Sequence, residues 1–329
     1  MTRPIRLICP RCRHDLTPVG DSLQCRSCHS AFPVVVGIPD LRVAPDPWIA
    51  MTDDRAKGIA VDAEASPGFE GAVRAYWART PDTPAADAAR HIDHVLRAVP
   101  RTREWVAGLT PTPVAGEQWL DLGCGTADLA CAAPAGVTVT GLDIAFRWLI
   151  IARRRLGEEG RSAELICGNA EALPFPDGSF DRVIALGTLE HCPDLDVVVS
   201  EARRVLRPGG RLHIRTANRF SLLAEPHVGV WGVGWLPRSW ADGYVRWRGG
   251  TGYLHHWLRG AGELHQALAR TGFVKTKVTA ARMLSAERNR LPRLLAPLVP
   301  IYDALRRAPI ADRICRAAAP LLDAEGVAP

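Results

Sequence analysis

Between residues 118 and 280, short apolar runs alternate with longer stretches in which apolar residues recur at the period of a helix. The apolar runs predict strands at 118–122, 137–143, 180–186 and 210–216, and a further strand that starts at 165. The intervening stretches predict helices, for example at 145–156 and 261–271. This alternation is typical of a parallel sheet with helices on both faces. We therefore predict that residues 115–285 form an α/β domain.

The pattern outside this domain is less regular. An apolar run at 31–41 predicts a strand that ends in a Gly/Pro turn. Prolines and glycines then punctuate a polar stretch, so residues 46–114 are predicted to form a linker and a lead-in with helices at 69–78 and 85–99. Residues 286–329 are predicted to form a helical extension that packs on the sheet. The alternative for this extension is a mildly basic amphipathic surface for a membrane or a partner.

The composition is that of a globular protein, with 329 residues of which 47% are hydrophobic and 23% charged. No stretch approaches the roughly 20 apolar residues of a membrane span, and the first residues lack the apolar core of a secretory signal. We therefore expect a cytoplasmic protein without stable membrane insertion. The net charge of +6 permits RNA binding but does not demand it, because the arginines are spread along the chain.

Four of the nine cysteines form two Cys-x-x-Cys pairs near the N-terminus, Cys9-Pro-Arg-Cys12 and Cys25-Arg-Ser-Cys28. Two such pairs separated by twelve residues can place four thiolates around one tetrahedral zinc ion. Two disulfides or a redox dithiol are the alternatives, and neither suits a reducing cytosol. We predict a zinc module at residues 1–45 whose metal is structural, because four sulfurs leave no open position.

Polar residues at the ends of the predicted strands form a candidate nucleotide site. The strand at 118–122 runs into a turn with Gly123 and Gly125, which let the backbone approach a ligand closely. Asp143 ends the next strand and can bind both ribose hydroxyls. Asn169 follows the third strand, where it can read an adenine amino group. The glycine turn by itself would equally suit a dinucleotide.

Five motifs in this region occur in a consistent order. Together they resemble the class I S-adenosylmethionine-dependent methyltransferases of the ubiquinone/menaquinone-biosynthesis type: Asp-Leu-Gly-Cys-Gly-Thr (121–126), Gly-Leu-Asp (141–143), Ala-Glu-Ala-Leu-Pro-Phe (170–175), Leu-Glu-His (189–191) and Val-Leu-Arg-Pro-Gly-Gly (205–210). The cysteine segment resembles the zinc ribbons that activate methyltransferases or are fused to them. These resemblances imply a Rossmann-like sheet, bound S-adenosylmethionine and a separate zinc ribbon.

The resemblance also implies roles for individual residues. It implies that the cofactor is bound by Asp121, Gly123 and Gly125 at its methionine portion, by Asp143 at its ribose, by Asn169 and Ala170 at its adenine, and in addition by Cys124, Ile144 and Leu186. The chain departs from the family at Ala127, where a third glycine is common, and at Asn169, where an aspartate is common. Alanine is small and asparagine keeps an acceptor oxygen, so binding is expected to survive both changes. An alternative role for Asp143 is to cap the helix that follows it.

The substrate side of the domain is expected after the strands at 180–186 and 210–216. His191 is a candidate general base, or else a structural histidine that ties its loop together. An insertion at 218–259 carries five of the ten tryptophans, together with Glu225, His227, His255 and His256. We expect it to form a lid or wall over the methyl donor; the alternative is that the tryptophans only anchor the insertion. A second metal site at His227, His255 and His256 has no compact ligand spacing to support it.

These features predict an enzyme that methylates an oxygen, nitrogen or carbon atom of a small, apolar or aromatic metabolite. One alternative is an RNA methyltransferase whose zinc ribbon contacts phosphates through Arg3, Arg6, Arg11, Arg13 and Arg26. Another is a cofactor-binding regulator without catalysis.

Overall fold

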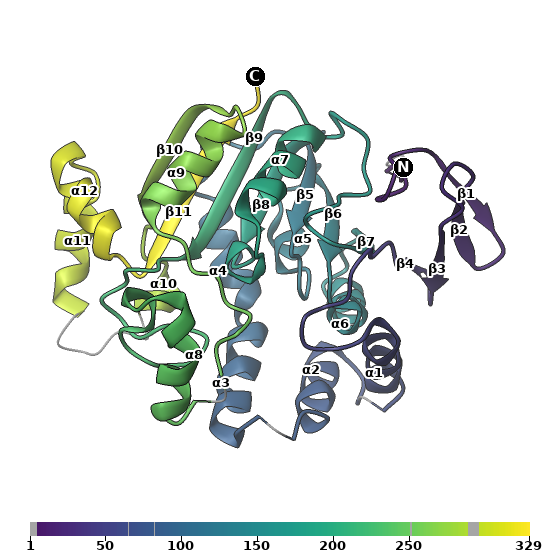
Figure 1. The fold of residues 1–329 in the computed structure, drawn as a ribbon, viewed down its shortest axis with the longest axis horizontal. Helices are drawn as coiled ribbons and strands as arrows, with labels where there is room; N and C mark the ends of the chain where they lie inside the picture. Colours follow the sequence, from purple (N-terminus) through teal and green to yellow (C-terminus); the bar gives the residue numbers. More distant parts are fainter. Residues whose placement is uncertain (1–4, 65, 82, 251, 289–295) are drawn as a thin grey trace. The chain divides into compact units, whose positions relative to one another are not determined.

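The computed structural model describes residues 5–64, 66–81, 83–250, 252–288 and 296–329 (Figure 1). The chain divides into two compact units, Met1–Arg182 and Val183–Pro329. Its larger sheet has seven strands in the order β10-β11-β9-β8-β5-β6-β7, which confirms the predicted α/β class. The division between the units falls inside the α/β domain predicted at 115–285, whose boundaries stay a prediction. Each unit is described separately below.

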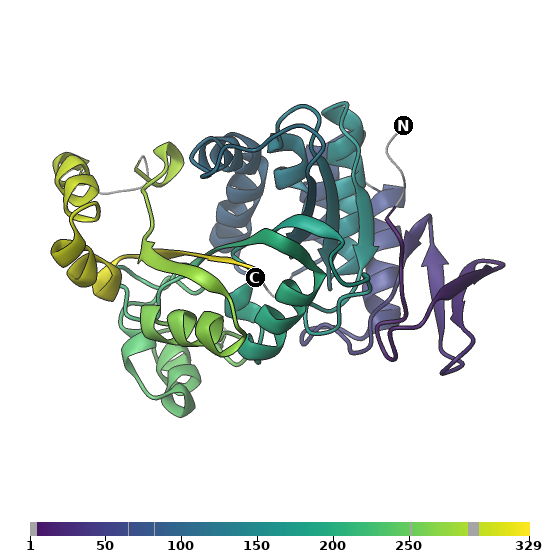
Figure 2. The same ribbon diagram turned by 90° about the horizontal axis from the view of Figure 1, so that it is seen from above.

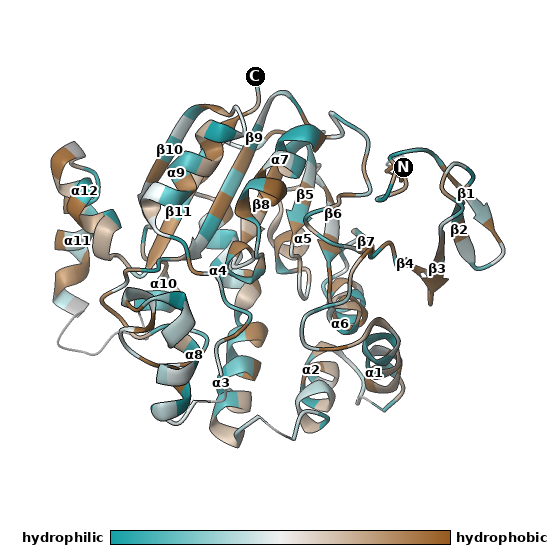
Figure 3. Ribbon diagram, viewed as in Figure 1, coloured by the Kyte–Doolittle hydropathy of each residue, from teal (hydrophilic) through white to brown (hydrophobic). Residues whose placement is uncertain are grey.

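The first unit begins with a small antiparallel sheet of four strands in the order β1-β2-β3-β4. Its strands are β1 (Leu16–Val19), β2 (Ser22–Cys25), β3 (Ala31–Val35) and β4 (Ile38–Pro39). Figure 3 shows most of β3 in the brown of hydrophobic residues. The apolar run predicted as one strand at 31–41 is therefore two short strands joined by a turn at Val36 and Gly37, both with positive φ.

Four helices follow: α1 (Met51–Glu64), α2 (Phe69–Ala78), α3 (Ala85–Leu96) and α4 (Ala98–Val106). The helix predicted at 69–78 is confirmed, and the one predicted at 85–99 ends at Leu96 and is followed by α4. The stretch before residue 69 was predicted to be a linker with turns, and this prediction was wrong where the chain forms α1. The sequence gives little sign of this helix because the residues that it buries are Asp54, Gly58 and Val61, a set without an apolar stripe.

The larger sheet of this unit contains β5 (Gln118–Leu122), β6 (Thr138–Asp143) and β7 (Glu164–Cys167), paired in parallel. The short α5 (Asp128–Ala132) follows β5, and α6 (Phe146–Glu158) follows β6. One face of α6 packs with Ile38 of β4 and Cys124 in a single buried cluster. The N-terminal module is thereby joined through apolar contacts to the turn that follows β5.

Strand β8 (Phe180–Leu186) crosses the division between the units. The helices of the second unit are α7 (Leu195–Val205), α8 (Arg238–Trp247), α9 (Ala261–Arg270), α10 (Ser285–Arg288), α11 (Val299–Leu305) and α12 (Pro309–Ala318), with 3-10 turns at Leu189–His191, Val233–Trp235 and Ala296–Leu298. Its further strands are β9 (Leu206–Ala217), β10 (Val274–Ala280) and β11 (Leu321–Val327). None of the described helices is long and apolar enough to cross a membrane.

The prediction of a purely helical extension at 286–329 was wrong at its end. After α11 and α12 the chain forms β11, which lies between β9 and β10 and is antiparallel to both (Figures 1 and 2). Alternate residues of β11 are buried, including Leu322 and Ala324. This two-residue period is the signature of a strand. Part of the extension, at 289–295, lies outside the described residues.

Candidate functional site

The turn between β5 and α5 has a backbone conformation that suits close approach of a ligand. Gly123 and Gly125 have φ values of 78° and 47°, in the left-handed region that glycine adopts readily. The N–H groups of Gly123 and Cys124 both donate to the carbonyl of Leu142 in β6, at 2.8 and 3.0 Å. Ala127, at the position where the family often has a third glycine, also has a positive φ of 59°. The backbone of Ala127 is therefore strained, because a left-handed conformation is unfavourable for alanine and not for glycine.

Asp143 holds this turn from the end of β6. One carboxylate oxygen accepts from the N–H of Gly125 and the other from the N–H of Ala145, each at 2.8 Å. The second bond is the helix-capping role considered as an alternative, and the first ties Asp143 to the glycine turn. Burial raises the pKa of Asp143 to about 6, although both hydrogen bonds favour the ionised form.

Asp121 lies under the same turn and is buried. Burial, followed by the charges of Asp128 and Asp143, raises the pKa of Asp121 well above its usual range. Three carboxyl groups thus surround the turn, and a cation placed there would favour their ionised forms.

Asn169 is buried, and its amide is engaged by the segment that follows the N-terminal module. Its Oδ1 accepts from the N–H groups of Val43 at 2.8 Å and Ala44 at 3.3 Å, and its Nδ2 donates to the carbonyl of Ala44 at 3.2 Å. An adenine amino group would have to displace one of the two donors from Oδ1. Beside it, Ala170 is half-buried.

A buried ionic network joins the same segment to the residue that follows Asp143. The guanidinium of Arg42 binds Asp40 at 2.6 Å, Asp54 at 2.7 Å and the carbonyl of Ile144 at 3.0 Å, and all three charged side chains are almost fully buried. Burial opposes ionisation of Asp40, but the hydrogen bond and charge of Arg42 outweigh it and hold the pKa of Asp40 below its usual value. This network fixes the backbone directly after Asp143.

Asp54 of α1 also caps helix α6. Its carboxylate accepts from the N–H groups of Phe146 at 2.7 Å and Arg147 at 3.3 Å, the first residues of that helix. The side chain of Arg147 in turn binds Asp54 and Asp46. The first N–H groups of a helix need such acceptors, and here they come from a distant helix instead of the residue before Phe146.

The four cysteines of the N-terminal module come together as predicted. Their sulfur atoms lie within 4.8 Å of one another, with Cys9 and Cys28 at 3.5 Å and Cys12 and Cys25 at 3.4 Å. Disulfide-bonded sulfurs lie about 2.0 Å apart, so these are free thiols. Four sulfurs on a zinc ion lie about 3.8 Å apart when each Zn–S bond is about 2.3 Å, so the four sulfurs lie near enough to one another to hold such an ion.

Three histidines of the second unit form a cluster. The imidazole nitrogens of His191, His227 and His256 lie within 4.8 Å of one another, and their ring centroids are 4.8–5.3 Å apart. His255 is not part of this group, which contains His191 instead; the sequence spacing had not supported a metal site at His227, His255 and His256. His255 lies in a turn directly before His256, so its closeness in the sequence does not place it in the cluster.

Acidic residues hold the cluster. The Nδ1 atom of His227 lies 2.5 Å from Glu225 Oε1, and the other oxygen of Glu225 accepts from the N–H groups of His227 and Val228. Burial acts against protonation of His227, but the hydrogen bond and charge of Glu225 raise its pKa above the ordinary value. Burial, together with the charges of His227 and His191, lowers the pKa of His256 to about 3, so His256 is neutral at physiological pH.

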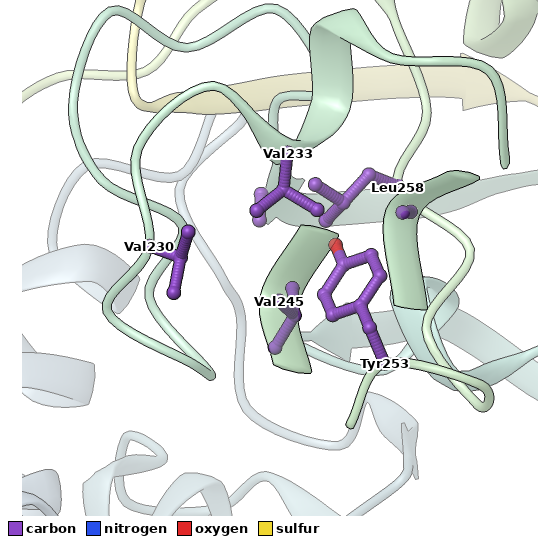
Figure 4. Close-up of a cluster of buried hydrophobic side chains, with 7 residues drawn as sticks. Val230, Val233, Val245, Tyr253 and Leu258 are labelled. Carbon is purple, nitrogen blue, oxygen red and sulfur yellow. The ribbon is translucent and has the colours of Figure 1, made fainter. Parts of the chain in front are cut away.

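The buried core of the insertion at 218–259 is not built from its tryptophans. Figure 4 shows its core, in which Val230, Val233, Val245, Tyr253 and Leu258 gather. Four of its tryptophans are instead more than half exposed: Trp231, Trp235, Trp240 and Trp247. These four side chains therefore do not form the interior, which branched aliphatic residues and Tyr253 fill, although the indoles of Trp231 and Trp235 donate to the carbonyls of Leu222 and Ser221. Their role as a substrate wall stays a prediction.

Comparison with known proteins identifies the region that contains these motifs. Residues 120–214 match the model of a family described as a methyltransferase domain. The chain carries a methyltransferase domain. Its resemblance to the class I S-adenosylmethionine-dependent enzymes is thereby confirmed at the level of the domain.

Several curated relatives share this methyltransferase domain. A ubiquinone biosynthesis O-methyltransferase from Thiobacillus denitrificans is 41% identical over 123 residues, which are 36% of this chain and 52% of the relative. A 27-O-demethylrifamycin SV methyltransferase from Amycolatopsis mediterranei is 40% identical over 119 residues, 35% and 43% of the two chains. A ubiquinone/menaquinone biosynthesis C-methyltransferase from Methylobacterium nodulans is 36% identical over 143 residues, 38% and 56%. The chain spans about half the length of these relatives.

Several residues around the methyltransferase domain had no assigned role in the sequence. Arg42 and Asp54 had no motif to reveal them, although Asp40 and Arg42 stand inside an apolar run, where charges need partners. Glu190 belongs to the Leu-Glu-His motif but is buried, and it accepts from Thr216 Oγ1 at 2.7 Å.

Among the arginines considered for RNA contact, Arg6 pairs with Asp15 and Arg3 lies outside the described residues.

Proposed function

We propose that this protein transfers the methyl group of S-adenosylmethionine to an oxygen, nitrogen or carbon atom of a small, apolar or aromatic metabolite. The observation that carries the proposal is the match of residues 120–214 to the methyltransferase domain family. The relatives support the substrate class, since they are named for ubiquinone biosynthesis and for 27-O-demethylrifamycin SV. They include both an O- and a C-methyltransferase, so the proposal does not restrict the acceptor atom.

The residues around the glycine turn fit this cofactor. Each oxygen of Asp143 accepts one backbone N–H, and a carboxylate oxygen has capacity for a further donor such as a ribose hydroxyl. Asp121 would meet the positively charged methionine portion, since a nearby cation favours its ionised form. Gly123, Cys124 and Gly125 would form the backbone wall, and Ile144, Asn169, Ala170 and Leu186 complete the proposed cofactor-binding set.

When bound, S-adenosylmethionine supplies a methyl group on a positively charged sulfur that is open to in-line attack. The chain contributes mainly alignment and exclusion of water, because well-oriented reactants gain much of the required rate. A proton acceptor is needed only where the attacking atom must lose a proton. His191, His227, His255 and His256 are the proposed candidates for this task.

The cysteine module would hold a structural zinc ion and brace the cofactor site. Leu41 donates its N–H to the carbonyl of Cys167 in β7 at 2.7 Å, and Asp40 forms a parallel bridge to the same residue. Arg42 then reaches Ile144. The segment that leaves the module thus extends to both strand ends that carry proposed cofactor residues, which favours a bracing role.

Transfer of label from S-adenosylmethionine to fractionated cell lysate tests the proposed activity. Label in the organic-extractable small-molecule fraction is the expected result. Label in RNA would contradict the proposed substrate class. Tight cofactor binding without transfer to any fraction would contradict an enzymatic role and support a regulator.

Direct binding of S-adenosylmethionine tests the cofactor site. Asp143→Ala is expected to abolish measurable binding in calorimetric titration, because the ribose contact and the support of Gly125 are both lost. Asp87→Ala is the matched control, since Asp87 is a half-exposed aspartate of α3 that pairs with Arg90. Retained affinity in Asp143→Ala would show that the ribose contact is misplaced.

A further inference from the structure

The histidine cluster of the second unit is built by three segments far apart in the chain. His191 ends the 3-10 turn after β8, His227 lies in a turn after β9, and His256 precedes Trp257. The N–H of Trp257 donates to the carbonyl of Glu190 at 2.6 Å, which brings His256 next to His191. Tyr253 stacks on the ring of His256 at 4.9 Å with an interplanar angle of 10°. Each ring is therefore positioned by contacts of its own segment.

The turn that presents His227 is organised by one buried carboxylate. Glu225 accepts from the N–H groups of His227 and Val228, at 2.8 and 2.9 Å, and the ends of the turn are closed by bonds between Glu225 and Val230 and between Gly229 and Glu225. Its second oxygen lies 2.5 Å from His227 Nδ1. Because a carboxylate accepts, this contact assigns the Nδ1 proton to the bond with Glu225, and in the neutral imidazole Nε2 is then the acceptor.

A histidine whose Nδ1 donates to a carboxylate while Nε2 is an acceptor has the arrangement found at metal-bound histidines. Here Nε2 of His227 lies 4.0 Å from Oε1 of Glu190, whose other oxygen is held by Thr216. Three imidazoles thus converge on one place, and a carboxylate oxygen of Glu190 lies beside one of them. Two acidic side chains, Glu190 and Glu225, would offset the charge of a cation there.

The spacing of the nitrogens is close to that of a bound ion. Three nitrogens around a tetrahedral zinc ion lie about 3.3 Å apart when each Zn–N bond is about 2.0–2.1 Å. Those of the cluster lie within 4.8 Å, so small side-chain rotations bring them to that distance. Imidazole ligands suit zinc, nickel, copper and iron, and disfavour magnesium and calcium.

We propose that His191, His227 and His256 form a second metal site, for a divalent first-row transition metal such as zinc, separate from the cysteine module. Three histidines leave a fourth position, which an oxygen ligand from solution fills. The site is thus of the open kind, in contrast to the closed set of four sulfurs at the N-terminus.

Titration with cobalt(II) of the full chain, its cysteine module already loaded with zinc, tests this site. Cobalt bound by histidines gives visible d–d absorption, and cobalt bound by thiolates adds strong charge-transfer bands in the near ultraviolet. The expected result is saturation at one equivalent with d–d bands alone. His227→Ala and His256→Ala are each expected to weaken binding by more than about 100-fold, and Glu225→Gln by about 10- to 100-fold.

His255→Ala is the matched control, because it removes the neighbouring histidine that lies outside the cluster, and it is expected to bind cobalt like the unchanged chain. Circular dichroism checks that each variant is folded. If a histidine variant does not fold, the weakened cobalt binding expected of Glu225→Gln still tests the site. The proposal is overturned by the absence of saturable d–d absorption at millimolar cobalt. Equal affinity in His256→Ala, or absorption confined to thiolate bands, would overturn it as well. None of these readouts depends on methyl transfer.

Discussion

The four cysteines and the three histidines are both groups whose ligand atoms lie within 4.8 Å of one another, but the chain assembles them differently. The cysteines come from two turns of one small sheet, between Cys9 and Cys28. The histidines come from three segments between 191 and 256, brought together by tertiary contacts such as that of Trp257 with Glu190. A local group is fixed by its own turns, whereas a dispersed group depends on the packing of the whole unit.

The largest expected effect tests the local group. Cys25→Ser should remove the metal from the module, because a structural zinc site contributes an apparent ~10–16 kcal/mol of binding free energy that is also folding free energy. We expect the metal content to fall by one ion per chain and amide exchange at residues 5–41 to lose its protection. Cys315→Ser, at a partly exposed cysteine of α12, is the control. Unchanged metal content in Cys25→Ser would contradict the assignment.

The next effect tests whether the segment that leaves the module is part of the first unit's core. Arg42→Ala leaves Asp40 and Asp54 buried without their partner, and breaking such a pair costs about 3–5 kcal/mol. Urea unfolding should show this loss. Arg74→Ala breaks an exposed pair with Glu70 and should cost less than about 1 kcal/mol. Similar losses in both variants would argue that the Arg42 network does not stabilise the fold.

A third prediction concerns the packing on which the dispersed histidine group depends. Leu258→Ala opens a cavity in the core of the insertion and should cost about 2–5 kcal/mol in unfolding free energy. Trp247→Ala removes a side chain that is 76% exposed and should change stability by less than about 0.5 kcal/mol. The reverse order, measured by thermal or urea unfolding, would show that the tryptophans hold the insertion after all.

The smallest effect is a pH dependence of the cofactor site. Asp143 has a pKa of about 6, so it is ionised above that pH and protonated below it. Ribose hydroxyls donate to the ionised form, so affinity for S-adenosylmethionine should be constant above pH 7 and fall about tenfold per unit below pH 6. Calorimetric titrations from pH 5 to pH 8 measure this change. Asp143→Asn should bind weakly with a flat profile; the same slope in that variant would assign the titration to another group.

The sequence predicts the structure best where the residues that define an element or a site are close together along the chain. The bounds predicted for β5 and β8 agree with the structure, because central parallel strands are rich in apolar residues. The grouping of the four cysteines is likewise predictable, because it follows from the spacing of the two Cys-x-x-Cys pairs. Helix α1 was missed because its buried face is built around Asp54, whose partners Arg42, Phe146 and Arg147 lie outside the helix.

In the candidate site, too, the sequence predicts contacts within a motif and misses contacts that depend on tertiary packing. The motifs predicted that Asp143 and the glycine turn belong together, and the structure joins them through Gly125. No motif predicts that the amide of Asn169 is engaged by Val43 and Ala44, because that contact depends on where the segment after the module runs. In the tryptophan-rich insertion, the sequence does not show which residues form the core, since large aromatic residues suggest a core and here valines supply much of it.

The position of β11 in the sheet affects the order in which the strands of the second unit can pair during synthesis. Strand β10, at the edge of the sheet, bonds to β11, and β11 also bonds to β9. During synthesis, β9 and β10 leave the ribosome before the strand that joins them. The sheet must then close through contacts distant in sequence, which form slowly and leave an unpaired strand edge in the meantime. The module of β1 to β4 needs no later segment for its strand pairing, so the four cysteines can come together in the nascent chain before the strands of the second unit are all available.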